Sequence, residues 1–492
     1  MLYHSTRNES AKRFTSAEAI KLGIAEDGGL FIPDSIPALK NDDIAKITNM
    51  SYPERAAYIL SKFLTDYTYD ELLSDCTLAY GETGFPGGAA PLVKVNDSIY
   101  SLELWHGPTS AFKDMALQIM PKLLSRALVK TGEKRTAFIL VATSGDTGKA
   151  ALEGYRDVDH TRITVFYPSD GVSRVQKLQM ATQLGSNVNV VAIKGNFDDA
   201  QTGVKRIFAD DAASKALDSA GYFFSSANSI NWGRLAPQIV YYISTYCDML
   251  SNGTIKNGDA VNVCVPTGNF GNIFAAYIAK RMGLPIAKLI CASNQNNVLT
   301  DFIATGTYDR NRTFHTSISP SMDILISSNL ERLLYVLAGS EKTAEYMKSL
   351  SEDGKYTIDG ETKAKIDADF AGYFCDEENT KKTIKETFDK YGYLCDTHTA
   401  VGLFCAERYI EETKDEKKII LASTASPFKF ASDVFFSLTG KRASDEFSAL
   451  DELCDYSGAP IPYPLRGLDK KKIRFDKVIK KEDMKSDIIG SL

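Results

Sequence analysis

One lysine of the chain is placed where its amine can act as a nucleophile. Lys113 ends a run that starts at Trp105 and contains a Gly-Pro pair, and an apolar helical stretch, Met115–Leu124, follows it. The Gly-Pro pair predicts a turn before the lysine, and a hydroxyl at Thr109 or Ser110 can cap the helix. A lysine near apolar walls can have a lowered pKa, and its neutral amine can form a Schiff base. Taken alone, a lysine here is more often a surface residue.

A glycine loop between a strand-like run and a helix can bind an anion. Gly268-Asn-Phe-Gly-Asn272 follows the apolar run Val261–Val265 and opens a predicted helix that ends at Met282. Its glycines allow a tight turn, and the free N–H groups of a helix start attract phosphate. These residues therefore predict a phosphate-binding loop, with a plain strand–helix turn as the alternative.

A second loop, Thr143-Ser-Gly-Asp-Thr-Gly148, follows the apolar run Ala137–Ala142. It lacks the Gly-x4-Gly-Lys-Ser/Thr spacing of a nucleoside triphosphate loop and the Gly-x-Gly-x-x-Gly spacing of a dinucleotide site. Its hydroxyls and the helix start behind it favour a carboxylate ligand instead.

A third polar cluster runs from Ser225 to Arg234, as Ser-Ser-Ala-Asn-Ser-Ile-Asn-Trp-Gly-Arg. Arginine binds phosphate or carboxylate through its planar fork, although a capped turn with a surface arginine is the alternative. A Schiff-base lysine, a phosphate loop and a carboxylate loop are together what pyridoxal phosphate chemistry requires.

The elements that position these residues alternate regularly between about 135 and 295. Apolar strand-like runs are separated by amphipathic helices, which predicts an α/β fold with a parallel sheet covered on both faces. Ligands of such sheets bind at the carboxyl ends of the strands, where both glycine loops fall. The predicted strands are Ala137–Ala142, Ile163–Tyr167, Val188–Ile193, Val261–Val265 and Leu289–Ala292.

The chain has 492 residues, 44% of them apolar, and a net charge of −6, which together suit a folded protein of about three domains. The first 90 residues predict a mostly helical module, and 340–390 a charge-rich helical region. The lysines of 470–485 are partly balanced by acids, so we expect a solvated surface and no nucleic-acid partner.

The cysteines and the apolar runs indicate in which cellular compartment the protein is located. The eight cysteines form no close pairs, and no histidine or cysteine cluster has metal-ligand spacing, so we expect reduced thiols and no metal. The start of the chain has no apolar signal core, and the longest apolar runs are far below the roughly 20 residues of a membrane span. We therefore expect a cytoplasmic protein with no membrane contact.

Taken in order, these motifs resemble the threonine synthases of the long bacterial and fungal type, a family of fold type II pyridoxal phosphate enzymes similar to tryptophan synthase β. The resemblance covers nearly the whole chain. Its motifs are Glu26-Asp-Gly-Gly-Leu-Phe-Ile-Pro33, His106-Gly-Pro-Thr-Ser-Ala-Phe-Lys-Asp114, Thr143–Gly148, Pro266–Asn272, Ser319-Pro-Ser-Met-Asp323, His398-Thr-Ala-Val401 and Ser423-Thr-Ala-Ser-Pro-Phe-Lys-Phe430.

The resemblance implies a role for each site residue. Lys113 corresponds to the lysine that carries the cofactor, and Thr424 to the hydroxyl at the pyridine nitrogen. The cofactor phosphate would bind at Gly268, Asn269, Phe270, Gly271 and Asn272. The substrate carboxylate would bind at Ser144, Asp146 and Thr147, and the substrate phosphate at Asn228, Ser229, Asn231 and Arg234. Ser426 and Thr397 depart from the family, where many relatives have histidine and proline.

The resemblance also implies a domain plan and a reaction. The plan has an N-terminal threonine synthase domain (1–90), a catalytic region of two doubly wound lobes (91–460, with 131–234 as a smaller mobile lobe) and a C-terminal tail (461–492). The reaction is the conversion of O-phospho-L-homoserine and water to L-threonine and phosphate by a monomer or homodimer. The alternatives are a phospholyase that releases 2-oxobutyrate, ammonia and phosphate, a serine or threonine dehydratase, and a non-catalytic binding protein.

Overall fold

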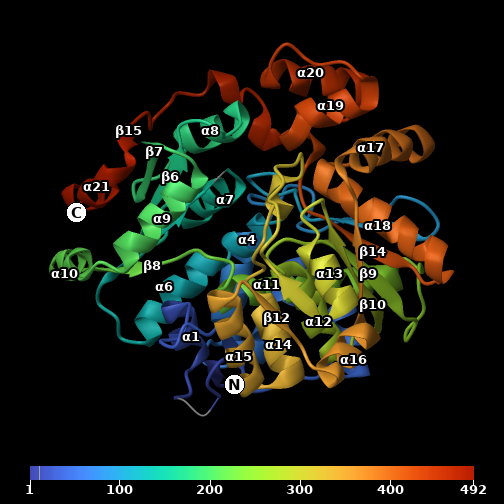
Figure 1. The fold of residues 1–492 in the computed structure, drawn as a ribbon, viewed down its shortest axis with the longest axis horizontal. Coiled ribbons are helices and arrows are strands. Elements are labelled where there is room, and N and C mark those ends of the chain that lie inside the picture. Colours follow the sequence, from blue (N-terminus) through green and yellow to red (C-terminus); the bar gives the residue numbers. More distant parts are fainter. Residues whose placement is uncertain (10–11, 144) are drawn as a thin grey trace.

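The computed structural model describes residues 1–9, 12–143 and 145–492. Over these residues most strands belong to two sheets, a larger one and a smaller one, with helices around both (Figure 1). The predicted α/β class is therefore confirmed.

The larger sheet has the strand order β13-β10-β9-β14-β4-β3, and all neighbours are parallel except β3 and β4. Every residue of β9 and β14 is buried, so this part of the sheet is covered on both faces. The strands are β3 (Leu92–Lys94), β4 (Ile99–Glu103), β9 (Val261–Pro266), β10 (Ile286–Ser293), β13 (Phe370–Phe374) and β14 (Ile419–Ser423).

The smaller sheet has the order β15-β7-β6-β5-β8 and is parallel throughout. Its strands are β5 (Thr136–Ala142), β6 (Thr161–Pro168), β7 (Val188–Lys194), β8 (Tyr222–Ser225) and β15 (Val478–Lys480). Its helices are α7 (Asp146–Tyr155), α8 (Arg174–Ala181), α9 (Phe197–Phe208), α10 (Asp211–Ser219) and α21 (Met484–Gly490).

The N-terminal module is mostly helical, as predicted. Thr15 and Thr68 each accept a hydrogen bond from a glutamate N–H three residues on, which fixes the starts of α1 and α4. The module comprises β1 (Tyr3–Ser5), α1 (Ser16–Leu22), β2 (Phe31–Pro33), α2 (Asn41–Thr48), α3 (Tyr52–Phe63) and α4 (Tyr69–Tyr80). It packs on α11 (Trp232–Ser251), where Arg55 pairs with Asp248 at 2.6 Å.

The other helices pack around the larger sheet and its connections. They are α5 (Asp114–Leu117), α6 (Met120–Lys130), α12 (Gly271–Arg281), α13 (Val298–Thr305), α14 (Leu330–Ala338), α15 (Ser340–Glu352), α16 (Gly360–Asp369), α17 (Glu377–Tyr391), α18 (Thr397–Thr413), α19 (Ala431–Thr439) and α20 (Glu446–Ser457). A short hairpin pairs β11 (Thr307–Asp309) with β12 (Lys355–Thr357).

Two local features differ from the sequence expectation. The predicted helix over 115–124 is divided into α5 and α6, since Pro121 has no N–H to continue the first helix from Leu117. The segment 461–492 is folded: β15 pairs with β7, and the C-terminal helix lies beside α9 and α10 (Figure 1).

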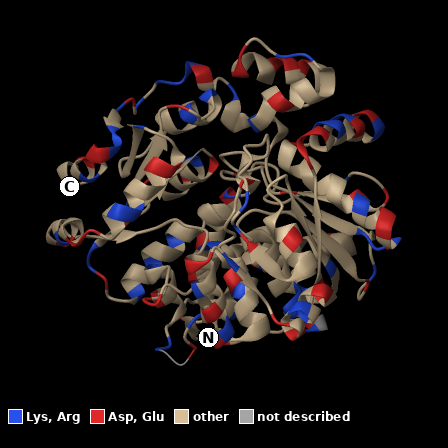
Figure 2. Ribbon diagram, in the orientation of Figure 1, with Lys and Arg blue, Asp and Glu red and all other residues tan. Residues whose placement is uncertain are grey.

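Two lysines of the C-terminal segment pair with acids beside the smaller sheet. Lys481 pairs with Asp199 at 2.8 Å, and Lys485 pairs with Asp210 at 2.6 Å. Figure 2 shows basic and acidic residues interspersed along the outer helices and this segment. No helix in the part of the chain that the structure describes is both long enough and apolar enough to span a membrane.

Candidate active site

Lys113 lies in a turn that contacts the residues following β14 of the larger sheet and β5 of the smaller sheet. The N–H of Phe112 donates to the carbonyl of Thr424 at 2.8 Å, which ties this turn to the end of β14. The Lys113 Nζ donates to Ser321 Oγ at 3.2 Å and lies 3.6 Å from Asp146 Oδ2. Its side chain is only 11% exposed, so the amine meets few solvent molecules.

Burial lowers the pKa of Lys113, and the Asp146 carboxylate partly opposes this by raising it. The positive charges of Lys429 and Arg234 lower the pKa further. The site therefore favours the neutral amine more than water does, as nucleophilic chemistry requires.

Asp146 is the first residue of α7, and its side chain is buried. Burial by itself would raise the pKa of Asp146, but the charges of Lys429 and Lys113 more than offset this and hold it well below its usual range. The carboxylate also accepts a hydrogen bond from Gln176 Nε2 at 2.8 Å. Asp146 is therefore a fixed negative charge beside the Lys113 amine.

Lys429 was not predicted as a site residue. Its fully buried Nζ lies 2.9 Å from Asp146 Oδ1 and donates to the carbonyl of Thr109 at 2.8 Å. It belongs to the Ser423–Phe430 motif, so a signal was present, but only the folded chain brings it to Asp146. Thr109 also differs from the prediction: it does not cap α5 but donates from N–H and hydroxyl to the Asp114 carboxylate, at 2.8 and 2.7 Å.

The predicted phosphate loop follows β9 and ends at the start of α12. Phe270 has a φ of 62°, a left-handed conformation that costs energy for a residue other than glycine and clusters at functional sites. A Cβ added at Gly268 would lie 2.6 Å from the carbonyl oxygen of Ser321, so only glycine fits there. Asn329 holds the carbonyl of Asn269 with two donors at 3.0 Å, one from its backbone and one from its amide.

Asn272 presents a polar group that the protein itself does not use. Its Oδ1 accepts hydrogen bonds from the hydroxyls of Tyr241 and Tyr242, at 2.6 and 2.5 Å. Its buried Nδ2 has no hydrogen-bond partner among the described residues. A buried donor of this kind is costly unless a ligand accepts from it.

Arg234 is the second such group. It is 4% exposed and donates from one nitrogen to the carbonyl of Ala227 at 2.8 Å, while its Nε lacks a partner among the described residues. Burial lowers the pKa of Arg234 to about 10. A buried cation that no described carboxylate neutralises is suited to an anionic ligand.

The other predicted substrate residues lie in different environments. Asn228 is exposed, and Ser229 and Thr147 are half-buried. Asn231 is buried, and its amide is engaged at both ends, accepting from the Gly233 N–H and donating to the Ile20 carbonyl. Ser144 lies outside the described residues. The site roles of all these residues remain predictions.

Two of the residues expected at the pyridine end of the cofactor, Thr424 and Ser426, follow β14. Thr424 is 6% exposed, and its carbonyl holds the Lys113 turn. Ser426, one of the departures from the family, accepts from the Phe428 N–H at 3.3 Å. Thr397, the other departure, is fully buried at the start of α18.

Ser321, the hydroxyl partner of Lys113, is positioned by a histidine. Its N–H donates to His398 Nε2 at 3.2 Å, and His398 Nδ1 lies 2.7 Å from Asp396. Since Nε2 accepts, Nδ1 carries the proton and donates to the carboxylate. His106, in contrast, stacks on Trp105 and bonds to Glu103 at 2.7 Å, so it orients the turn.

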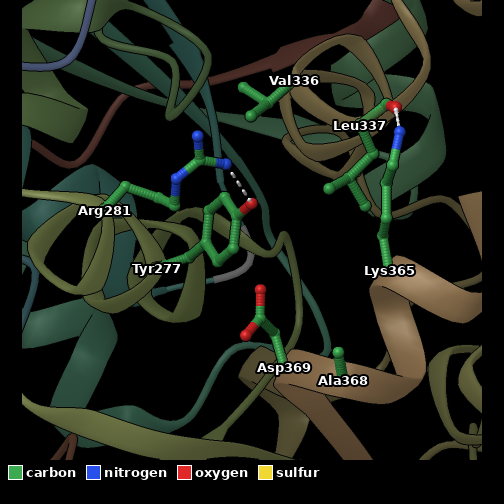
Figure 3. A pocket seen from close by; sticks show the side chains of 7 residues that line it. All are labelled: Tyr277, Arg281, Val336, Leu337, Lys365, Ala368 and Asp369. Carbon is green, nitrogen blue, oxygen red and sulfur yellow. Dashed lines mark hydrogen bonds between the residues drawn. The ribbon is translucent and has the colours of Figure 1, made fainter.

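A separate surface pocket of about 390 Å³ lies between α12, α14 and α16 (Figure 3). Its polar groups are engaged by the protein: Arg281 donates to the Tyr277 hydroxyl at 2.9 Å, and Lys365 to the Leu337 carbonyl at 3.0 Å. Neither Lys113 nor a glycine loop lines it, so it is distinct from the candidate active site.

Comparison with known families defines first the class of protein. Residues 86–424 match the family described as "Pyridoxal-phosphate dependent enzyme". Residues 2–80 match "Threonine synthase N terminus", and residues 399–489 match "Threonine synthase, C-terminal".

Individual relatives then narrow the class. The chain is 39% identical to a threonine synthase of Pseudomonas aeruginosa over 87% of this chain and 89% of that one. It is 40% identical to human threonine synthase-like 1 over 92% of this chain but spans only 61% of that protein's length. The crystal structure of pyridoxal phosphate-bound threonine synthase from Brucella melitensis superposes with a TM-score of 0.89 at 35% identity, covering 100% of this chain and 99% of that one.

The chain belongs to the threonine synthase family of pyridoxal phosphate-dependent enzymes. This confirms the predicted family, fold and cofactor class. The predicted domain limits (1–90, 91–460 and 461–492) stay predictions.

Proposed function

We propose that this chain catalyses the conversion of O-phospho-L-homoserine and water to L-threonine and phosphate, the last step of threonine biosynthesis. The observation that carries the proposal is that two buried donors of the predicted site, Asn272 Nδ2 and Arg234 Nε, have no partner among the described residues, while the Arg234 charge also acts on the Lys113 amine. One donor suits the cofactor phosphate and the other suits a phosphate on the substrate.

The loop from Gly268 to Asn272 fits the phosphate of pyridoxal phosphate. Two tyrosine hydroxyls occupy Asn272 Oδ1, so its NH₂ group is left to donate to an anion. The N-terminus of α12 begins at the same place and adds backbone N–H groups and a favourable dipole. Lys113 would bind the cofactor covalently, and Thr424 would face its pyridine nitrogen.

The bound cofactor would withdraw electrons from the substrate α-carbon and so ease proton loss and departure of the γ-phosphate. Lys113 Nζ would accept the proton of Cα and later return it. Arg234, with Asn228, Ser229 and Asn231, would bind the departing phosphate and stabilise its charge. The substrate carboxylate would bind at the start of α7, to the hydroxyls of Ser144 and Thr147 and the backbone N–H of Asp146, whose own carboxylate is held by Lys429 and Gln176.

The proposal also covers the cellular location of the protein and its oligomeric state. The eight cysteines are all unpaired, which supports a reducing, cytoplasmic location. The substrate is a small molecule, and the enzyme acts as a monomer or homodimer.

We further propose that 131–234 forms a smaller lobe that closes over the substrate. Identical small-angle scattering curves with and without a substrate analogue would contradict this closure.

The deciding experiment is a product assay with O-phospho-L-homoserine. We expect equal amounts of phosphate and L-threonine. Phosphate with 2-oxobutyrate and ammonia would identify a phospholyase, and turnover of unphosphorylated threonine or serine would identify a dehydratase. Lys113→Ala should abolish turnover and the absorption of lysine-bound cofactor, whereas the surface variant Lys382→Ala should change neither. Full activity of Lys113→Ala would overturn the proposal.

A further inference from the structure

Two buried lysines share one carboxylate at the centre of the site. Asp146 Oδ1 lies 2.9 Å from Lys429 Nζ, and Asp146 Oδ2 lies 3.6 Å from Lys113 Nζ. The Lys429 amine is fully buried and also donates to the carbonyl of Thr109 at 2.8 Å. The Asp146 carboxylate therefore interacts with both lysines and not with Lys113 alone.

Lys429 connects three segments that meet at the Lys113 amine. It lies in a short 3₁₀ turn, Pro427–Phe430, just after β14 of the larger sheet. Asp146 opens α7, which follows β5 of the smaller sheet, and Thr109 lies in the turn before Lys113. The 3₁₀ turn is itself anchored, since the Ser426 N–H donates to the Ser110 carbonyl at 3.1 Å. One ammonium group thus fixes the direction of the carboxylate.

We propose that Lys429 is a positioning residue for Lys113, which engages one oxygen of Asp146 and so prevents a tight ion pair between Asp146 and the Lys113 amine. The inference rests on the proposed function, in which Lys113 reacts as a neutral amine. Two ammonium groups beside one carboxylate repel each other. This repulsion favours loss of a proton from Lys113, because Lys429 is held more closely by Asp146, at 2.9 Å against 3.6 Å, and also donates to the Thr109 carbonyl.

The charged groups that face Lys113 come from three elements. They are Asp146 on α7, Lys429 in the 3₁₀ turn and Arg234 on α11. Removal of the Lys429 charge would remove a repulsion and leave Asp146 to pair with Lys113 alone. Both changes raise the pKa of Lys113, so the neutral amine would form only at higher pH. Lys429 also faces the buried Asp114, but that carboxylate is held by Thr109.

The test measures the amine directly, without turnover. The full-length cofactor-free chain is mixed with pyridoxal phosphate, and the rate at which lysine-bound cofactor absorption appears is followed against pH. In Lys429→Met we expect the midpoint of this profile to rise by about one pH unit. Lys429→Arg keeps the charge and should stay within a few tenths of a unit of the native value. The surface control Lys382→Met, 64% exposed on α17, should not shift.

An unmoved midpoint in Lys429→Met would overturn the proposal. If that variant does not fold, the double variant Lys429→Met/Asp146→Asn lacks both charges of the pair and is compared with Asp146→Asn alone. The double variant should have the higher midpoint, because only it lacks the repulsion from Lys429, and equal midpoints would overturn the proposal. Native enzyme without threonine synthase activity would count against the proposed function alone, since the reconstitution profile does not depend on the substrate.

Discussion

Two buried arginines of the chain differ in what neutralises them. Arg55 donates to Asp248 at 2.6 Å and to Ser244 Oγ at 2.8 Å. Arg234 donates only to the carbonyl of Ala227 and pairs with no carboxylate within residues 1–9, 12–143 and 145–492. Because an unpaired buried charge costs stability, its presence is explained best by a ligand.

Replacement of Arg234 by glutamine should separate activity from stability. If Arg234 binds the substrate phosphate as proposed, the variant loses charge-assisted hydrogen bonds worth about 1.5–3 kcal/mol, so kcat/KM for O-phospho-L-homoserine should fall roughly 10- to 100-fold. The free energy of unfolding should not fall, since a costly buried charge is removed. Steady-state kinetics and urea denaturation measure the two quantities.

Arg55→Gln is the matched control. Here the buried cation has a carboxylate partner, so its loss should cost about 1–3 kcal/mol of stability while the folded enzyme keeps its kcat/KM. The opposite pattern, with Arg234→Gln unstable and fully active, would show that Arg234 serves the fold and not the substrate.

At the scale of elements, the distance between Lys113 and Asp146 is set by the contact of two short helices. α5 starts directly after Lys113, and α7 starts at Asp146. They touch where a Cβ added at Gly154 would lie 1.9 Å from the carbonyl oxygen of Leu117. Glycine at this position is therefore required for the two helices to approach.

Gly154→Ala should push α7 away from α5. We expect a loss of about 1–3 kcal/mol in stability from overpacking, together with a lower kcat because Asp146 moves relative to the Lys113 amine. Gly360→Ala, on α16 with open space around it, is the control and should leave both quantities nearly unchanged. An unaltered kcat in Gly154→Ala would mean that this helix contact does not control the site.

Much of this architecture could be predicted from local patterns. The apolar runs at 137–142, 188–193 and 261–265 are strands in the structure, as predicted. Strands that are covered on both faces of a sheet consist mainly of apolar residues, so the composition indicated them. The sequence did not predict strand β13, which lies within a charge-rich region. Its middle residues are only half-buried at an edge of the larger sheet, so the strand has no long apolar run. The sequence did not predict β15 either, because this short strand ends in lysine and its composition is typical of an exposed segment.

Candidate site residues could be proposed from the sequence where one loop carries them, but not where distant segments meet. Lys113 and the 268–272 loop follow from local spacing. Lys429 could not be assigned, because the role proposed for it depends on a contact with Asp146 that no local pattern encodes. For Asn231 the structure adds a role that the sequence did not indicate: its amide caps α11 and donates to the Ile20 carbonyl of the N-terminal module, while its predicted role in substrate binding stays a prediction.

At the scale of the whole molecule, the C-terminal segment belongs structurally to the smaller lobe. β15 extends the smaller sheet beside β7, and Met484 and Ile488 are buried against α9 and α10. A Cβ added at Gly203 of α9 would lie 2.4 Å from the sulfur of Met484, so α9 and α21 are in close contact at this position. If the smaller lobe moves, this segment moves with it.

Met484→Ala tests this attachment. Removal of a fully buried methionine side chain should cost about 2–5 kcal/mol, and hydrogen exchange should quicken in α9, α10 and β7 but not in the larger sheet. Ile489→Ala, on the same helix but 36% exposed, should cost less than about 1 kcal/mol. Equal destabilisation by the two variants, or exchange that quickens only within 484–492, would indicate a tail that merely rests on the lobe. Loss of protection throughout the smaller sheet would instead show that the C-terminal segment and the smaller sheet unfold as one cooperative unit.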